Sequence, residues 1–224
     1  MALNRLQRRP GSRVNRRADG IPGAARAAGM APSGAVRVLV MVLALVLSWP
    51  VGADTGLPRD GQRWLVTALA GLHDDSRFLE ILQLDGGDVG SSYLGGGAVG
   101  RELGYWGRSA VWEGEAQLYR HWGEQSLWEG NLAVALRWTR FPWDGLVDTS
   151  IAFGQGVSVA SERPPVEGDT RRLLHHMHVD LEFRPPSSRH LSLVGRLHHR
   201  SGVFGLYGVS GGSNFLTLGL RYRF

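Results

Sequence analysis

The sequence contains no cysteine, no lysine and no apolar run long enough to form a membrane-spanning helix. The absence of cysteine excludes disulfide scaffolds and cysteine-ligated metal sites. The longest apolar run, residues 38–47, has ten residues, whereas a helix needs about 20 to cross a bilayer. A polytopic helical membrane protein is therefore excluded as well.

The basic residues, all of them arginine, are unevenly distributed along the chain. Eight of the 25 lie in residues 1–53 beside a single acid, Asp19, so residues 54–224 hold 17 arginines and 19 acidic residues. The net charge of +5 therefore belongs to the N-terminal segment. Because the rest of the chain offers no excess of positive charge, we expect no nucleic-acid partner.

The N-terminal segment has the pattern of a secretory signal peptide. Arg37 precedes the apolar run, Ser-Trp-Pro at 48–50 ends it, and Val-Gly-Ala at 51–53 provides small residues for cleavage before Asp54. A core helix or strand is the alternative interpretation. We predict that residues 1–53 are a basic leader plus signal peptide that is removed, with Met30 the more natural initiator. Residues 54–224 then form a single domain of ordinary size.

Within that domain, polar and apolar side chains alternate with a period of two, and no window sustains the period of an amphipathic helix. In residues 171–184, for example, His176, His178 and Asp180 lie on one face, and Met177 and Val179 lie on the other. The pattern predicts eight strands, at residues 63–72, 91–103, 109–122, 127–141, 148–160, 171–184, 190–201 and 213–224.

These strands are longer than those of an ordinary soluble sheet, which have about 5–6 residues. Tryptophans bracket the apolar faces, as in the pairs Trp112/Trp122 and Trp128/Trp138. Ten residues at about 3.3 Å each span about 33 Å along a tilted strand, enough for the apolar band of a membrane barrel. A soluble sandwich would alternate similarly but explains neither the length nor the tryptophans. We predict an all-β, eight-stranded antiparallel transmembrane β-barrel of the bacterial outer membrane.

The connections between the predicted strands alternate in length. Residues 104–108, 142–145 and 185–189 are short, residues 73–90, 161–170 and 202–212 are long, and only 123–126 departs from the alternation. Outer-membrane barrels have short periplasmic turns and longer extracellular loops, so both ends of the barrel domain should be periplasmic. The final Phe224, with apolar residues alternating before it, resembles the C-terminal signal of such barrels.

The interior of an eight-stranded barrel is filled by side chains, so we expect no pore. Two inward histidines, His176 and His178, could suggest a metal site, but a third ligand cannot be identified from the sequence, and we expect no cofactor. The simpler interpretation is a polar network of the inward residues Glu113, Glu115, His176, His178, Asp180 and Glu182 with Arg137 and Arg184.

The seventh strand carries two polar residues on its lipid-facing side. His199 and Ser201 share that face with leucines, and residues two apart in a strand are about 7 Å apart at the backbone, so the imidazole can reach the hydroxyl. Unpaired polar groups facing hydrocarbon cost several kcal/mol, so a functional pair near the outer leaflet is one interpretation, and interfacial polar residues at the rim are the other. His190 and Ser192 repeat the spacing at the opposite end but face inward.

The end of the chain resembles the lipid A 3-O-deacylase (PagL) family of eight-stranded outer-membrane barrels. The resemblance rests on the motif at 196–202 (Arg-Leu-His-His-Arg-Ser-Gly), the glycine-rich loop that follows it, Gly-Ser-Asn-Phe at 212–215 and the final Tyr-Arg-Phe. It covers about the last 30 residues. It implies Ser201 as the nucleophile, His199 as the general base, and lipid A of lipopolysaccharide in the outer leaflet as the substrate.

The acidic triad residue of that family falls near Asn214 here, on the same outward face as Leu216 and Leu218. An asparagine can still fix a histidine tautomer, although it stabilises an imidazolium less than a carboxylate does. Amides of the loop at 202–212 could supply an oxyanion hole. The candidate functions are a lipid A ester hydrolase, an acyltransferase using the same wall, and a non-enzymatic barrel that anchors, adheres or stabilises the membrane. The sequence leaves the oligomeric state open.

Overall fold

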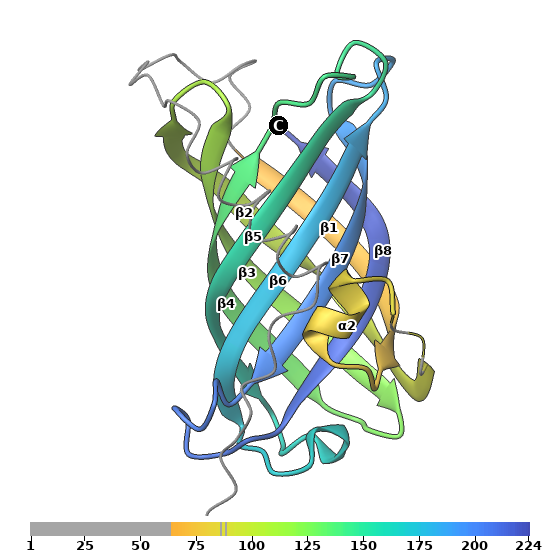
Figure 1. Cartoon of the computed structure of the whole chain (residues 1–224), viewed down its shortest axis with the longest axis vertical. Coiled ribbons are helices and arrows are strands. Elements are labelled where there is room, and N and C mark those ends of the chain that lie inside the picture. Colours follow the sequence, from red (N-terminus) through yellow and green to blue (C-terminus); the bar gives the residue numbers. More distant parts are fainter. Residues whose placement is uncertain (1–63, 86, 88) are drawn as a thin grey trace, which may run out of the picture.

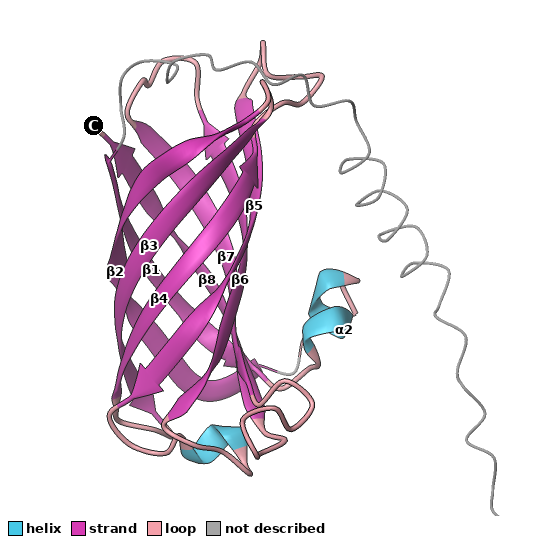
Figure 2. Ribbon diagram, turned by 90° about the vertical axis from the view of Figure 1, so that its left-hand side faces the viewer, coloured by secondary structure: helices cyan, strands magenta, loops and turns pink. Residues whose placement is uncertain are grey.

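A computed structural model of the chain describes residues 64–85, 87 and 89–224. These residues form a closed antiparallel barrel in which each of eight strands pairs with its neighbours in chain order and the last pairs with the first (Figures 1 and 2). The predicted fold class is confirmed. The predicted leader and signal peptide, and the first residues of the predicted domain, lie outside the described residues.

Each predicted strand corresponds to one strand of the barrel, and the boundaries differ by three residues or fewer. The longest strand extends beyond its predicted end to Trp106, past a register shift between Glu102 and Gly104. The strands are β1 (Trp64–Asp74), β2 (Val89–Trp106), β3 (Ala110–Gly123), β4 (Trp128–Trp138), β5 (Asp148–Ala160), β6 (Leu173–Arg184), β7 (Leu191–Ser201) and β8 (Gly212–Arg223).

Two short helical segments lie in connections that were expected to be loops. The helix α2 (Phe78–Leu82) lies between β1 and β2, and the 3-10 turn η1 (Pro165–Glu167) lies between β5 and β6. The backbone amide of Arg77 donates to Glu80 Oε2 at 2.8 Å, which satisfies a donor at the start of α2. Among the described residues, no helix has the length and hydrophobicity to cross a membrane.

The connections divide the barrel into two ends. The loop end, at the bottom of Figure 1, carries the connections 75–88, 124–127, 161–172 and 202–211, together with α2 and η1. The turn end carries the connections 107–109, 139–147 and 185–190 and the last residue, Phe224. There the amide of Trp64 donates to the Phe224 carbonyl at 3.0 Å, and the Phe224 amide donates to the Trp64 carbonyl at 2.9 Å. These two bonds extend the closure between β1 and β8 to the rim.

The outer wall is apolar along the middle of the strands and aromatic towards both ends. Leu118, Leu132 and Leu218 are examples of exposed side chains from the middle of the wall. The exposed aromatic residues near the turn end include Trp64, Trp106, Trp112 and Tyr222, and those near the loop end include Tyr93, Trp122 and Trp128. An apolar band between two aromatic girdles is the exterior of a transmembrane barrel.

The interior is filled by side chains, many of which form buried ion pairs. Asp180 accepts hydrogen bonds from Arg137 at 3.2 Å, Arg196 at 2.6 Å and Arg221 at 2.8 Å. Glu115 also binds Arg196, at 2.6 Å. The predicted polar network is therefore present, with Arg196 and Arg221 as further members. Arg184 does not belong to it, because this side chain pairs with Asp148 at the partly exposed turn-end rim.

Candidate active site

His199 and Ser201 lie on the outer wall at the loop end of β7, as predicted. Their neighbours His198 and Arg200 are buried inside the barrel, whereas His199 and Ser201 are half-buried on the other face of the strand. Ser201 is the last residue of β7. Among the hydrogen bonds of the described residues, none joins the two side chains directly. A pair of catalytic groups often lacks this bond before substrate arrives.

Asn214 on β8 holds the imidazole of His199. The two residues are directly paired across the sheet, and His199 Nδ1 lies 2.7 Å from Asn214 Oδ1. The amide nitrogen of Asn214 donates to the Ser76 carbonyl at 2.7 Å. Because that nitrogen must face a carbonyl, the amide oxygen faces the imidazole, and Nδ1 of His199 must be the protonated nitrogen. Nε2 is left as the basic nitrogen.

Sequence reasoning missed an acid that lies on the far side of Asn214. Asp74, the last residue of β1, is paired with Asn214 in the register, and its Oδ1 accepts the Ser76 amide at 2.8 Å. Asp74 therefore holds the backbone of Ser76, whose carbonyl accepts from Asn214, and Asn214 in turn orients His199. We call these four residues the wall relay. Alternation along β1 and closure of the barrel against β8 were the signals that could have identified Asp74.

The connection between β1 and β2 folds back over this part of the wall. Figures 1 and 2 show α2 outside the barrel, beside the loop-end halves of β7 and β8. The ring centroid of Phe78, the first residue of α2, lies 4.9 Å from that of His199. Asn214 is only 7% exposed. The cover therefore shields the hydrogen bond between Asn214 and His199 from its surroundings, which strengthens it.

A second imidazole lies next to Ser201. His175 faces outward on β6, opposite to its inward neighbour His176, and it is the direct cross-strand partner of Ser201. The β-carbons of such partners are about 4.5–5.5 Å apart. Ser201 therefore has His199 two residues before it on its own strand and His175 beside it on the next. Only His199 of these two is hydrogen-bonded to Asn214.

The loop after Ser201 has a strained backbone. Val203 and Phe204 have φ angles of 48° and 51°, a conformation that is costly for residues other than glycine. Their amides do not donate to any other described residue, whereas the Gly202 amide donates to the Gly211 carbonyl at 3.1 Å. In the loop that we predicted could supply an oxyanion hole, these are the first two amides after Ser201 that make no such hydrogen bond. The side chains of Phe204 and Leu206 are exposed at the loop tip.

Steric constraints explain why the residue after Ser201 is a glycine. A β-carbon at this position would lie 2.0 Å from the Val209 carbonyl oxygen, so no larger residue fits without moving the loop. Of the second His-x-Ser sequence, Ser192 lies as predicted, buried inside the barrel near the turn end and 3.2 Å from Arg223 Nη1. The prediction for His190 was wrong: this residue precedes β7, is exposed, and stacks its ring on that of the exposed Tyr222.

No family model matches the chain, and no curated protein matches it. The solved structures that are similar to it include a designed protein and a natural one. A de novo designed transmembrane β-barrel is 12% identical, with a TM-score of 0.41, and the match covers 76% of this chain and 100% of that one. The outer membrane protein OprG from Pseudomonas aeruginosa is 10% identical, with a TM-score of 0.39, and the match covers 73% and 96%.

The class of molecule follows from its own fold and side chains. It is an eight-stranded transmembrane barrel with an ion-paired interior. Its lipid-facing wall carries a histidine of defined tautomer beside a serine.

Proposed function

We propose that the barrel is an outer-membrane hydrolase that removes an ester-linked acyl chain from lipid A. The observation that carries the proposal is the 2.7 Å bond from Asn214 to His199, two residues from Ser201, on the outer wall. Serine becomes a nucleophile when an adjacent base takes its proton and a third group orients that base. Ser201, His199 and Asn214 supply these three groups.

The position of the pair on the wall favours a lipid substrate. Ser201 ends its strand at the loop end, where the outer wall passes from the apolar band to the aromatic girdle and the ester linkages of a membrane lipid lie. Exposed Phe204 and Leu206 provide apolar contacts beside it. Long loops are extracellular in barrels of this kind, and lipid A occupies the outer leaflet there. The resemblance of the last 30 residues to the PagL family supports the same substrate.

In the proposed reaction, Ser201 Oγ attacks the ester carbonyl while Nε2 of His199 takes the hydroxyl proton. The amides of Val203 and Phe204 donate to the oxyanion of the tetrahedral intermediate. Collapse of the intermediate releases the sugar alcohol, which receives the proton from His199, and leaves an acyl group on Ser201. Water, activated by His199, then hydrolyses this acyl-enzyme to the free fatty acid and restores Ser201.

The test is the mass of lipid A from cells with and without the protein. We expect loss of one acyl chain with the wild type. With Ser201→Ala we expect at least about a 10³-fold lower rate, because no nucleophile remains. Ser192→Ala is the matched control, since this serine has the same His-x-Ser spacing but lies inside the barrel, and it should deacylate like the wild type.

The other outcomes separate the alternatives. A gain in lipid A mass by one acyl chain would indicate an acyltransferase. Unchanged lipid A, or equal deacylation by wild type and Ser201→Ala, would refute the mechanism and leave a non-enzymatic barrel. Both variants should still run as folded barrels on unheated gels, because Ser201 packs little and Ser192 is a small residue.

A further inference from the structure

We propose that the barrel interior binds one divalent transition-metal ion, with Zn²⁺ as the reference ion, between Glu129, His176 and His198. These residues come from β4, β6 and β7 and face inward near the loop end. The site lies inside the wall and is separate from the serine site on the outer face.

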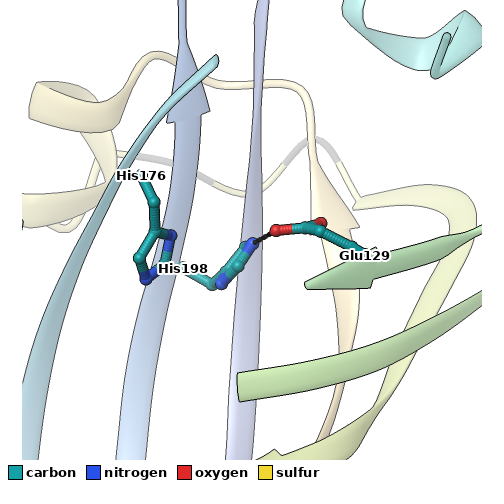
Figure 3. A group of neighbouring side chains, drawn as sticks. All are labelled: Glu129, His176 and His198. Atoms are coloured by element: carbon teal, nitrogen blue, oxygen red, sulfur yellow. Dashed lines mark ion pairs between the residues drawn. The ribbon is translucent and has the colours of Figure 1, made fainter. Parts of the chain in front are cut away.

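The three side chains lie close together, with the ring of His198 between His176 and Glu129 (Figure 3). One potential ligand atom from each lies within 4.8 Å of the others, and all three residues are buried. Ligand atoms around a tetrahedral zinc ion are about 3.3 Å apart, from bond lengths of about 2.0–2.1 Å. Small side-chain rotations would therefore bring the three atoms to coordination distance.

His198 and Glu129 are close together, but their contact does not have the geometry of a hydrogen bond. Nε2 of His198 lies 2.9 Å from Oε1 of Glu129, which is an ion-pair distance. Neither ring nitrogen of His198, however, has a partner with hydrogen-bond geometry among the described residues. Two side chains that bind the same metal ion lie close together without a hydrogen bond between them, because their lone pairs point at the ion and not at each other.

His176 also has a nitrogen available. Its Nε2 lies 3.2 Å from Nδ1 of His178, whereas its Nδ1 has no hydrogen-bond partner among the described residues, and the side chain is fully buried. Buried nitrogens are nearly always satisfied in native proteins, so an unpaired one calls for an explanation such as an ion. Nδ1 of His176 and Nε2 of His198 are the nitrogens we assign to the metal.

Groups around the site would orient the ligands. The second carboxylate oxygen of Glu129 lies 2.8 Å from His121 Nε2, and Nδ1 of that ring lies 2.9 Å from Gln125. Ser158 donates to the first oxygen at 3.0 Å. Metal ligands characteristically have such hydrogen-bonded outer partners. On one side the site is closed by aromatic rings, since Tyr119 and Phe215 pack edge-on against His198.

The charge balance and the ligand types favour a transition metal. The nearest cation, Arg200, has its Nε 3.9 Å from Glu129, but its Nη1 donates to Glu167 at 2.7 Å, so Glu167 compensates its charge. Glu129 is then free to neutralise the ion. Two imidazoles and one carboxylate suit zinc and its neighbours in the first transition row, whereas magnesium and calcium prefer oxygen ligands alone. Water would complete the coordination.

The experiment is a calorimetric titration of the purified, folded barrel in detergent micelles with Zn²⁺. We expect one ion per chain for the wild type. His176→Ala and His198→Ala should each weaken binding by more than about 100-fold, and His121→Ala should weaken it by about 10–100-fold. His190→Ala, at the turn end, is the matched control and should bind like the wild type. Ser201→Ala should also bind normally, so failure of this proposal and failure of the proposed hydrolase are distinguishable.

A second measurement does not depend on the folding of any variant. Wild-type barrel loaded with Co²⁺ should show the strong visible absorption of a four-coordinate ion, and an excess of Zn²⁺ should abolish it. Absence of that absorption, absence of saturable Zn²⁺ binding, or undiminished binding by folded His176→Ala and His198→Ala would overturn the proposal.

Discussion

At His199, an amide does the orienting that a carboxylate does in a serine hydrolase triad. The Asn214 oxygen accepts a hydrogen bond from Nδ1–H of His199, because the Asn214 nitrogen donates to the Ser76 carbonyl and this fixes the orientation of the amide. Asp74 takes part indirectly, through the Ser76 amide. The wall relay therefore fixes the histidine tautomer without placing a negative charge next to the ring, which stabilises an imidazolium less than a neighbouring carboxylate would.

Replacing Asn214 tests this role. Asn214→Leu keeps the shape but removes both hydrogen bonds, and we expect the turnover number to fall by about 10²–10⁴-fold, as when a triad loses its orienting group. Asn214→Asp keeps an acceptor for Nδ1 but places an oxygen against the Ser76 carbonyl. We expect it to stay within about tenfold of the wild type, measured by fatty-acid release from lipid A. Equal rates for Asn214→Leu and the wild type would show that Asn214 does not position the base.

Which imidazole activates Ser201 is a separate question. His199 and His175 both lie beside the serine, but only His199 is oriented by Asn214. We therefore expect His199→Ala to lower the rate of deacylation by about 10²–10⁴-fold, the usual contribution of a general base, and His175→Ala to lower it by less than about tenfold. The reverse order would make His175 the base.

The sequence predicted where the candidate site residues on regular strands lie. Alternation along β7 and β8, with the resemblance, was sufficient to place His199, Ser201 and Asn214 together on the outer wall. It was not sufficient for Ser76 and Phe78, because their contacts depend on how a loop folds against strands far along the chain. Likewise, alternation predicted that His176 faces inward, but only the register of the closed barrel places it close to Glu129 and His198.

Among the elements, the strands were predicted well and the short helices were not. A strand of 11 or more residues repeats its period several times, whereas α2 has five residues and completes little more than one turn. The longest strand also continues through a register shift after Glu102. The alternation changes phase there, so the pattern no longer predicts where the strand ends. The loops differ from the strands because their conformation depends on side-chain contacts instead of a repeat.

The two sets of connections give a prediction about orientation. If the loop end is outside the cell, protease added to intact cells should cut within residues 161–170 and should spare residues 185–189, which lie at the turn end. The fragments can be assigned by mass spectrometry. Cleavage at 185–189 alone would show that the barrel has the opposite orientation. The serine site would then lie at the inner leaflet, where lipid A is absent.

For the whole molecule, stability depends on mutual neutralisation of the buried charges. Asp180 contacts three buried arginines. Asp180→Ala should lower the free energy of unfolding in lipid vesicles by about 3–5 kcal/mol, because it leaves buried positive charge uncompensated. Asp148→Ala is the control: its pair with Arg184 is partly exposed, so we expect a loss of about 1 kcal/mol or less. Urea titration measures both. Equal losses would mean that burial of the network does not matter.

The wall relay crosses the line along which the barrel closes. Asp74 and Ser76 belong to the first strand and its loop, whereas Asn214 and His199 belong to the last two strands, about 140 residues later. A chain that is still threading through the periplasm with its first and last strands apart has no oriented histidine. In the proposed enzyme the final step of membrane insertion is therefore also the step of activation, and newly made copies are latent until they reach the membrane that contains their substrate.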